Sequence, residues 1–278
     1  MSILRYIITL VVSIGTVSVA TAQETSDSIH SHAFAVGIGS SHQLDTYLSP
    51  QNYSGLQINI LRETIRMTRM VQRRISFQSI WQGAFSHSQN ASQSATDWGG
   101  RISYDALWHY NWTPDRNLRL MVGGGAGADA GFLYNSRGGN NPAQARLGAD
   151  ISASIMAIYK FKCLGLPVNI RYQANLPVLG FMFSPQFGQS YYEIGEGHLN
   201  NNICFTYPLN AFSLWQQITA DIPLGKKFVL RVGYLCDIKQ SHINHIKMHD
   251  RSHSFMIGFV RHFRLIGKSE RDSKALIL

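Results

Sequence analysis

Cysteine is nearly absent from this chain. Its 278 residues include three cysteines, Cys163, Cys204 and Cys236, which lie far apart in the sequence. Three is an odd number, so one thiol must stay free even where disulfides form, and none of the spacings typical of zinc sites occurs. We therefore expect all three side chains to be apolar packing residues.

Charged residues are also few, at 15% of the chain, and acidic residues are outnumbered, 16 against 25 lysines and arginines. No basic cluster lies on one face of a helix, which argues against a nucleic-acid partner. A basic surface could instead meet anionic lipid or polysaccharide. Glycine, in contrast, is abundant, with 24 residues.

A long apolar run is missing everywhere except near the start. Residues 6–19 are almost wholly apolar, follow a short segment that contains Arg5, and precede small residues up to Ala22. This order is typical of a secretory signal peptide. The alternative is a membrane anchor, but a spanning helix needs roughly 20 apolar residues. We expect cleavage after Ala22, and no cysteine follows the apolar run, so a lipoprotein is excluded. Loss of Arg5 leaves 24 basic and 16 acidic residues, a net charge of +8.

The rest of the chain has a period of two. From Arg101 to Trp112 the even positions are apolar or aromatic and the odd ones mostly polar, and residues 146–161 repeat the pattern. Such alternation is typical of a strand with one apolar and one polar face. No stretch beyond residue 22 is a convincing amphipathic helix. Alternation recurs, in part more weakly, over residues 33–42, 54–63, 73–86, 117–129, 168–173, 212–222, 228–236 and 252–263.

Alternation alone would also fit a soluble β-sandwich with one wet face. Three features favour a membrane barrel. The strands are longer than the roughly 5 or 6 residues usual in soluble sheets. The apolar phase ends in aromatic residues such as Trp112 and Phe161, as interfacial girdles require. The polar phase carries arginine and aspartate, which a dry core would not accept.

We therefore predict an all-β fold, a transmembrane antiparallel β-barrel of ten to twelve strands, because closure leaves no unpaired edge in lipid. The barrel is expected to occupy residues 23–264, after a signal peptide at residues 1–22 and before a C-terminal tail at residues 265–278. The strand count is ten if residues 176–210 form one excursion, and twelve if residues 200–207 pair back into the wall.

The lengths of the connections predict the orientation of the barrel. Short connections fall at residues 113–117, 162–165 and 223–226, and longer polar ones at residues 42–52, 87–97, 135–144 and 240–251. Barrels of Gram-negative outer membranes have short periplasmic turns and long outer loops. We therefore expect an exported outer-membrane protein with both termini and the tail in the periplasm.

Three stretches carry a family resemblance: LGFMFSPQFGQSYYEI at 179–194, DIPLGKKFVLRVGY at 221–234, and QSHINHIKMH with SFMIGFV between 240 and 260. They resemble an uncharacterised family of outer-membrane proteins common in Bacteroidota, domain of unknown function 3316. The resemblance covers most of the chain after the signal peptide and implies secretion, a barrel and the outer membrane. It implies no activity, so no functional residue is transferred from it.

The polar phase of the strands supplies the first candidate site. Buried ions persist only when they are matched, so we expect the charged side chains of this phase to form pairs inside the lumen. This predicted lumen network comprises Arg101, Asp105, Arg146, Asp150, Arg171, Arg231 and Asp237.

The stretch FSPQFGQSYYEIGEGH, residues 183–198, supplies the second candidate site. Its proline and glycines are turn formers, and we expect it to fold over or into the mouth of the barrel. Tyr191 and Tyr192 would then fill the mouth, while Glu193 and Glu196 would neutralise lumenal arginines.

The same part of the chain also offers candidates for hydrolysis: Ser190, Glu193, Ser241, His242 and His245. An outer-membrane hydrolase of the phospholipase or protease type would need a nucleophile and a base within hydrogen-bond reach. Neighbours in a strand point to opposite faces, so Ser241 and His242 cannot pair directly. No G-x-S-x-G nucleophile elbow occurs. We expect no catalytic centre here.

The histidines between residues 240 and 253 could hold a metal ion. The candidates are His242, His245 and His249, with His253 nearby, but beyond Asp250 no acidic residue has ligand spacing from them. We expect no metal and no cofactor. A ten-stranded lumen is narrow and largely filled by side chains, which argues against a general diffusion porin. The sequence therefore predicts either a loop-plugged barrel for transport or ligand binding, or a structural barrel at the surface. Its partners would be outer-membrane lipid and an unknown small solute or surface partner.

Overall fold

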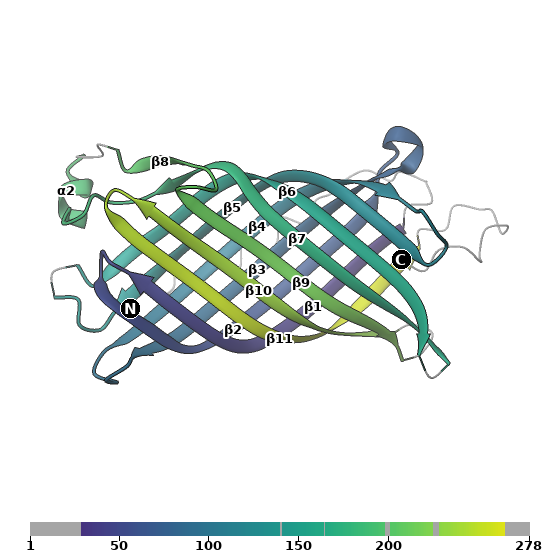
Figure 1. The fold of residues 1–278 in the computed structure, drawn as a ribbon, viewed down its shortest axis with the longest axis horizontal. Coiled ribbons are helices and arrows are strands. Elements are labelled where there is room, and N and C mark those ends of the chain that lie inside the picture. Colours follow the sequence, from purple (N-terminus) through teal and green to yellow (C-terminus); the bar gives the residue numbers. More distant parts are fainter. Residues whose placement is uncertain (1–28, 140, 164, 198–200, 225–227, 265–278) are drawn as a thin grey trace, which may run out of the picture. The chain divides into compact units, whose positions relative to one another are not determined.

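The computed structural model describes residues 29–264, except residues 140, 164, 198–200 and 225–227. This part of the chain is almost entirely β-structure, with a short 3-10 helix η1 (Met70–Arg73) and a single-turn helix α2 (Tyr191–Gly195) (Figure 1). None of its helices has the length and hydropathy needed to cross a membrane. The predicted signal peptide and tail lie outside the described residues. The strands are β1 (Ile29–Asp45), β2 (Ser49–Met67), β3 (Ile75–Asn90), β4 (Thr96–Trp112), β5 (Leu118–Asn135), β6 (Ala143–Cys163), β7 (Leu166–Phe183), β8 (Ile203–Thr206), β9 (Ala211–Pro223), β10 (Val229–Ile243) and β11 (Ile246–Arg264).

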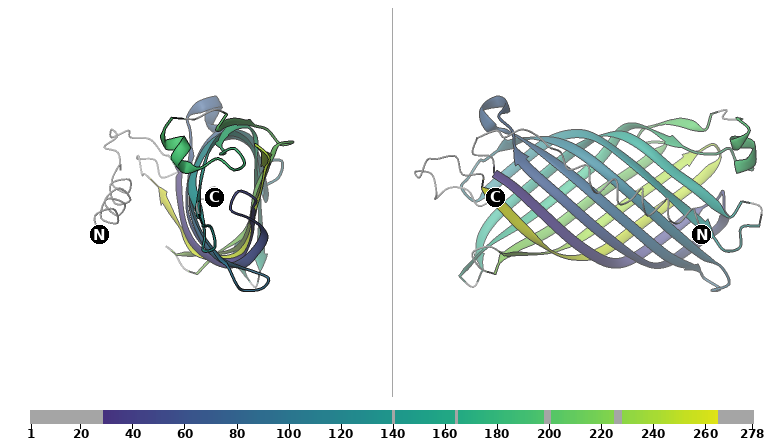
Figure 2. Two further views of the ribbon diagram at one scale, coloured as in Figure 1. Left: turned by 90° about the vertical axis from the view of Figure 1, so that its left-hand side faces the viewer. Right: turned by 180° about the vertical axis from the view of Figure 1, so that it is seen from behind.

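Ten of these strands close into a barrel (Figures 1 and 2). Neighbours in the chain pair antiparallel from β1 to β7, β7 then pairs with β9, and β11 returns to pair with β1. The prediction of an antiparallel barrel of ten to twelve strands is confirmed. The short strand β8 pairs only with the end of β7, so residues 203–206 fold back onto the wall without adding a strand to the ring.

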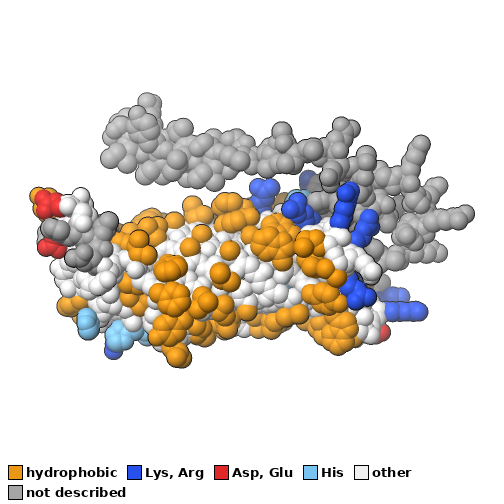
Figure 3. Space-filling model, turned by 90° about the horizontal axis from the view of Figure 1, so that it is seen from above, with side chains coloured by type: hydrophobic (Ala, Val, Ile, Leu, Met, Phe, Trp, Pro, Cys, Tyr) orange, Lys and Arg blue, Asp and Glu red, His pale blue; other side chains and the backbone are white. Residues whose placement is uncertain are grey.

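The two phases of the strands have the predicted faces. On β4 the side chains of Ile102 and Trp108 are 53% and 46% exposed on the outside, whereas Leu107 and His109 are fully buried inside. β6 repeats this pattern, with Ile151 outside and Ser154 inside. On the face shown in Figure 3, the outward apolar side chains form a broad band across the barrel. Such a band is typical of barrels that meet lipid.

The barrel has two different ends. Ile29 at the start of β1 pairs with Arg264 at the end of β11, so both ends of the described chain lie at one end of the barrel, which we call the terminal end. The other, called the loop end, carries the connection 184–210 with α2 and β8 (Figure 2). On the face shown in Figure 3, lysine and arginine side chains gather at the terminal end.

The predicted long polar loops are mostly strand. At the loop end the strands join through residues 46–48, 91–95, 136–142 and 244–245. The β10–β11 turn is especially tight, because Asn244 and His245 both adopt left-handed backbone angles, with φ of 53° and 62°. The expectation of four long loops was therefore wrong. Their polar residues belong to strand ends that continue beyond the apolar band, and only the connection 184–210 is long.

The three cysteines occupy different environments. All are free thiols; Cys236 is buried, Cys204 is partly buried and Cys163 is exposed near the β6–β7 turn. The expectation that all three pack in apolar surroundings was wrong for Cys163, because the strand end that carries it lies at the exposed terminal end.

Candidate ligand cavity in the barrel lumen

The half of the lumen near the terminal end contains a buried ion-pair layer. Glu63 on β2 accepts hydrogen bonds from Arg171 on β7, with Nη2 2.7 Å from Oε2, and from Nη1 of Arg231 on β10, also at 2.7 Å. Arg231 in turn donates through Nε to Asp221 on β9 at 2.6 Å. Gln78 completes the layer by donating to Glu63 at 2.7 Å. The layer balances two carboxylates against two guanidinium groups, as buried charges require.

An apolar belt lies next to this layer, toward the middle of the lumen. It comprises Ala35, Leu61, Ile80, Leu107, Leu235 and Met256, with Trp215 packed against it. The Trp215 indole nitrogen donates to Gln82 Oε1 at 2.8 Å. The ion-pair layer and the apolar belt draw side chains from every strand of the ring except β5 and β6. On those two strands Met121, Met156 and Ile158 form a separate apolar cluster.

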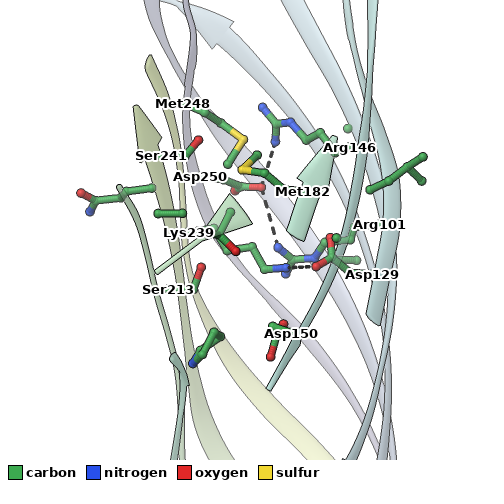
Figure 4. Close-up of a pocket in the computed structure, with 18 of the residues that line it drawn as sticks. Arg101, Asp129, Arg146, Asp150, Met182, Ser213, Lys239, Ser241, Met248 and Asp250 are labelled. Carbon is green, nitrogen blue, oxygen red and sulfur yellow. Dashed lines mark hydrogen bonds and ion pairs between the residues drawn. The ribbon is translucent and has the colours of Figure 1, made fainter. Parts of the chain in front are cut away.

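The loop half of the lumen is also charged, but less tightly packed (Figure 4). Arg146 contacts Asp45 and Asp250, each at 3.1 Å. Arg101 pairs with Asp237 and lies 4.0 Å from Asp250. Lys239 donates to Asp129 at 2.7 Å. These groups come from β1, β4, β5, β6, β10 and β11, which surround an open space instead of a packed layer.

This space consists of two cavities of about 120 Å³ and 50 Å³. Their linings share five residues, so together they form what we call the loop-half cavity. Figure 4 shows the larger one, with Arg101, Lys239 and Asp250 around it. Trp215 and Asn175 lie in the lining of the smaller one, on the side of the apolar belt. The shared residues are Asp129, Asp150, Pro177, Ser213 and Lys239.

Two carboxylates of the loop-half cavity have no cationic partner within 4.0 Å among the described residues: Asp105 on β4 and Asp150 on β6. Asp150 accepts a hydrogen bond from Ser152 at 2.5 Å. Both carboxylates flank Gly127 on β5, where a Cβ atom would lie 2.6 Å from Oδ1 of Asp105. Glycine therefore leaves room on β5 for the acidic side chains of the strands on either side of it, β4 and β6.

A further acceptor in the larger cavity also lacks a partner. Gln43 is 4% exposed and donates through Nε2 to Ser86 at 2.9 Å, but its Oε1 atom has no hydrogen-bond partner. A buried acceptor without a donor costs about 1–3 kcal/mol. The loop-half cavity thus presents carboxylates and an amide oxygen that would all be satisfied by a ligand with donor hydrogens and positive charge.

The structure brings the members of the predicted lumen network into the barrel interior but pairs them differently. Arg101 and Asp237 contact each other directly. Arg146, Arg171 and Arg231 pair with acids that we did not single out from the sequence, and Asp105 and Asp150 pair with no cation of the described residues. The residues missed were Asp45, Glu63, Asp129, Asp221, Lys239 and Asp250. Strand phase could have indicated Glu63 and Asp221, whereas Asp45 and Asp250 fall in stretches interpreted as loops.

Of the stretch 183–198, the described residues 183–197 lie at the rim of the barrel (Figure 2). Tyr191 accepts a hydrogen bond from the Ala145 N–H at 2.7 Å and packs edge-on against Tyr47, whose hydroxyl donates to the Gln189 carbonyl at 2.7 Å. Burial raises the pKa of Tyr47 to about 12. The rim of the barrel therefore anchors this connection through Tyr47 and Tyr191.

Glu193 and Glu196 do not reach the lumenal arginines. Ser190 and Glu193 form a capping box at the start of α2, in which each side chain accepts from the other's backbone N–H. Glu193 and Glu196 are exposed, as is Tyr192, at 74%. The expected pairs between these glutamates and arginine are not formed, because acids of the wall itself already hold Arg146, Arg171 and Arg231.

The candidates for hydrolysis do not converge. Ser190 caps α2, Ser241 points into the lumen, and His242 and His245 are exposed on the outside and in the β10–β11 turn. The described residues contain no group of three or more side chains placed to hold a metal ion. His242 and His249 both face outward but are not directly opposite each other, since His242 pairs with Lys247 and His249 with Gln240, and His245 lies in the turn.

The sequence was compared with protein-family profiles and with curated proteins. The profile of the family described as "Protein of unknown function (DUF3316)" matches residues 4–270. No curated protein matches the chain.

Among solved structures, the chain is similar to the translocator domain of the autotransporter NalP from Neisseria meningitidis. The identity is 12% and the TM-score 0.43, over 94% of this chain and 96% of that one. It is also similar to the outer membrane protease OmpT from Escherichia coli, at 7% identity and a TM-score of 0.46, over 88% and 99% of the two chains. It is also similar to the transport unit of the autotransporter AIDA-I from Escherichia coli, at 8% identity and a TM-score of 0.43, over 92% of this chain and 96% of that one. Similarities this distant assign no activity to the chain.

Proposed function

We propose that this chain, which belongs to the DUF3316 family of proteins of unknown function, is an outer-membrane barrel that binds a small cationic solute in its loop-half cavity. The observation that carries the proposal is the excess of negative charge in that cavity. Its lining and the ion pairs at its edge contain six aspartates and three cations among the described residues. They are Asp45, Asp105, Asp129, Asp150, Asp237 and Asp250 against Arg101, Arg146 and Lys239.

The membrane location is supported by the exterior of the barrel. Large apolar side chains such as Ile151 and Phe181, 58% and 55% exposed, cover its outside. Such a continuous apolar band would drive aggregation in water. The inside, in contrast, is polar and charged. This inversion of the usual soluble pattern is what lipid requires of a barrel, and the apolar stretch at residues 6–19 would direct its export.

The charge excess in the cavity contrasts with the rest of the chain. The whole chain has a net charge of +9, and the ion-pair layer around Glu63 is balanced. Among the described inward-facing carboxylates without a cation within 4.0 Å, Asp105 and Asp150 line the cavity, whereas Asp97 lies outside it and accepts a hydrogen bond from Asn135 at 2.6 Å. An ammonium or guanidinium group placed between Asp105 and Asp150 would pair with both, and charge-assisted hydrogen bonds of this kind are the stronger ones in proteins.

The barrel is not proposed to be a general diffusion pore. The apolar belt and the ion-pair layer lie across the lumen between the loop-half cavity and the terminal end, so a solute bound in the cavity meets packed side chains. We expect the refolded protein to show little conductance in planar bilayers. Passage of a solute to the periplasm would require these layers to rearrange.

Binding can be measured with a trimethylammonium compound that carries a nitroxide, because nitroxides quench tryptophan fluorescence at short range. Trp215 lines the cavity, whereas Trp81, Trp98, Trp108 and Trp112 lie on the outside, 41–59% exposed. The quenching lost on Trp215→Phe substitution therefore reports the cavity. We expect this Trp215-dependent quenching to saturate with increasing probe concentration in the wild-type protein.

The carboxylates supply the test of mechanism. We expect Asp105→Asn with Asp150→Asn to weaken binding at least about tenfold, the loss of roughly one charged hydrogen bond. The matched control is Asp115→Asn, which removes an exposed carboxylate from the β4–β5 turn. Quenching that never saturates, or that survives the double substitution, would contradict the proposal. Ester hydrolysis lost on Ser241→Ala or Ser190→Ala would instead favour a hydrolase.

A further inference from the structure

The wall of the barrel is not continuous between β7 and β9. Pairing of these two strands runs from Asn169 with Asp221 only as far as Asn175 with Trp215. Beyond that point, residues 211–214 of β9 pair only with β10. β7 continues along β6 but has no partner on its other side until Gly180 meets Thr206 of β8. The facing edges of β7 and β9 are thus unpaired with each other over residues 176–179 and 211–214.

This separation has a defined outline. Its lower limit is the last pair, Asn175 with Trp215, and its upper limit is the turn at residues 207–210, which connects β8 to β9. The turn is fixed by hydrogen bonds from the N–H groups of Asn210 and Ala211 to the Tyr207 carbonyl, at 3.1 and 2.9 Å. We call this interruption the wall window.

The β7 edge of the wall window is shaped by a bulge. The β6–β7 register shifts between Ile151 and Ser152, which pair with Leu179 and Pro177, so that β7 contains one extra residue here. Bulges bend a strand and increase its twist. Pro177 has no N–H group, so this edge presents one donor fewer that would need a partner. Bulge and proline together allow β7 to turn away from β9.

The wall window leads into the loop-half cavity. Pro177 and Ser213, which lie on its two edges, line both cavities. Phe181, Thr206 and Ala211 also line the larger one, and Ser213 lies in the same view of it as Asp150 and Lys239 (Figure 4). The two carboxylates without cationic partners are therefore next to a side opening of the wall.

The outside of the wall window is apolar on the β7–β8 side. Leu179, Phe181 and Phe205 are 49–55% exposed there, and Leu209 in the turn is 92% exposed. On the β9 edge, Phe212 is 38% exposed. Two strands farther around the wall, the outward residues at the same level include the polar Arg251, which pairs with Ile238. The wall window thus lies at the loop-end edge of the apolar band, the depth at which lipid headgroups meet hydrocarbon.

We propose that the wall window is a lateral entrance for a membrane-borne amphiphile with a cationic head, such as a long-chain amine or quaternary ammonium. The head passes between Pro177 and Ser213 to Asp150 and Asp105, and the alkyl chain remains in the lipid against the apolar rim. The inference rests on the proposed cation site but goes further, because it names the ligand class and its route. A solute that entered only from the water at the loop end would need no interruption of the wall.

The test compares two nitroxide probes that share a quaternary ammonium head, one with three methyl groups and one with a hexadecyl chain, in phospholipid vesicles that contain the full chain. Ser213→Leu fills the wall window from the cavity side. Ser103→Leu adds the same side chain to the cavity lining on β4, away from the wall window, and is the matched control. We expect Ser213→Leu to lower the Trp215-specific quenching by the hexadecyl probe about tenfold more than Ser103→Leu does. Both variants should affect the trimethyl probe alike.

A second variant is modified only after it has folded, so the modification cannot change how the barrel folds. Ser213→Cys, with Cys163, Cys204 and Cys236 changed to serine, is folded first and then blocked with a bulky maleimide. Blocking should abolish quenching by the hexadecyl probe. Equal effects of the two leucine variants on the hexadecyl probe, or unchanged quenching after blocking, would overturn the lateral entrance while leaving the cation site intact. If neither probe quenches Trp215 in wild type, the proposed function itself fails.

Discussion

Replacing Glu63 with glutamine should destabilise the barrel more than any other single change in charge. Glu63 is 3% exposed and accepts hydrogen bonds from Arg171, Arg231 and Gln78. Glutamine keeps the size of the side chain but removes its charge. Arg231 retains Asp221, whereas Arg171 keeps only the amide of Gln217, at 3.0 Å.

The magnitude follows from this arrangement. Removing one partner of a buried ion pair costs about 3–5 kcal/mol, because the other charge remains buried and unmatched. Glu63 serves two guanidinium groups, so we expect the upper part of that range. With urea slopes of about 1–3 kcal/mol per molar, the unfolding midpoint should fall by roughly 1.5–5 M.

The measurement is urea unfolding in lipid vesicles, followed by tryptophan fluorescence. Glu193→Gln is the matched control, because Glu193 is exposed on α2 and should change the midpoint little. Combining Glu63→Gln with Arg171→Met removes both members of one pair and should recover part of the loss. A loss below about 1 kcal/mol for Glu63→Gln, or a double variant less stable than the single one, would refute the reasoning.

Three further predictions concern the rim and the location of the protein. Tyr47→Phe should free the connection 184–210 for proteolysis, because it removes the hydrogen bond to Gln189. The pKa of Tyr47 is raised from 10.0 to about 12 in the folded state. The stability that the protonated hydroxyl gives to this connection should therefore be complete below pH 10 and lost as the pH rises toward 12, which pH-dependent proteolysis can test. Alanine at both Glu193 and Glu196 should leave bilayer conductance unchanged, and an increase in anion current would show that they reach the lumen. The protein should fractionate with outer membranes and migrate differently on gels before and after heating; recovery in the soluble periplasm would contradict the barrel in the membrane.

Strand phase could be read from the sequence because a strand has a fixed period of two. Once Trp108 is outward, His109 must be inward, and no information from the rest of the chain is needed. The ends of the strands could not be read in the same way. Outside the apolar band both faces meet water, so alternation disappears and stretches such as residues 87–97 have the composition of loops.

The pairing inside the lumen depends on the closed ring and not on local pattern. Arg231 and Glu63 are separated by 168 residues, and which acid meets which arginine is set by the register of all ten strands. The wall window was equally hidden. It depends on a register shift near Pro177, and a proline in an alternating stretch indicates only a weak strand. The loop-half cavity could therefore be predicted as a set of charges, but not as a site.

The ion pairs across the lumen have a consequence for how the barrel is assembled. Glu63 belongs to the second strand of the chain, and its partners arrive with β7 and β10, near the end. If strands add in order, this carboxylate stays unmatched until the sheet curls back and β11 reaches β1. Contacts at such large sequence separation form late in folding. We expect β11 to pair with β1 and Glu63 to gain its partners together. An unclosed sheet is then destabilised by the unmatched carboxylate, and the barrel closes in one cooperative step.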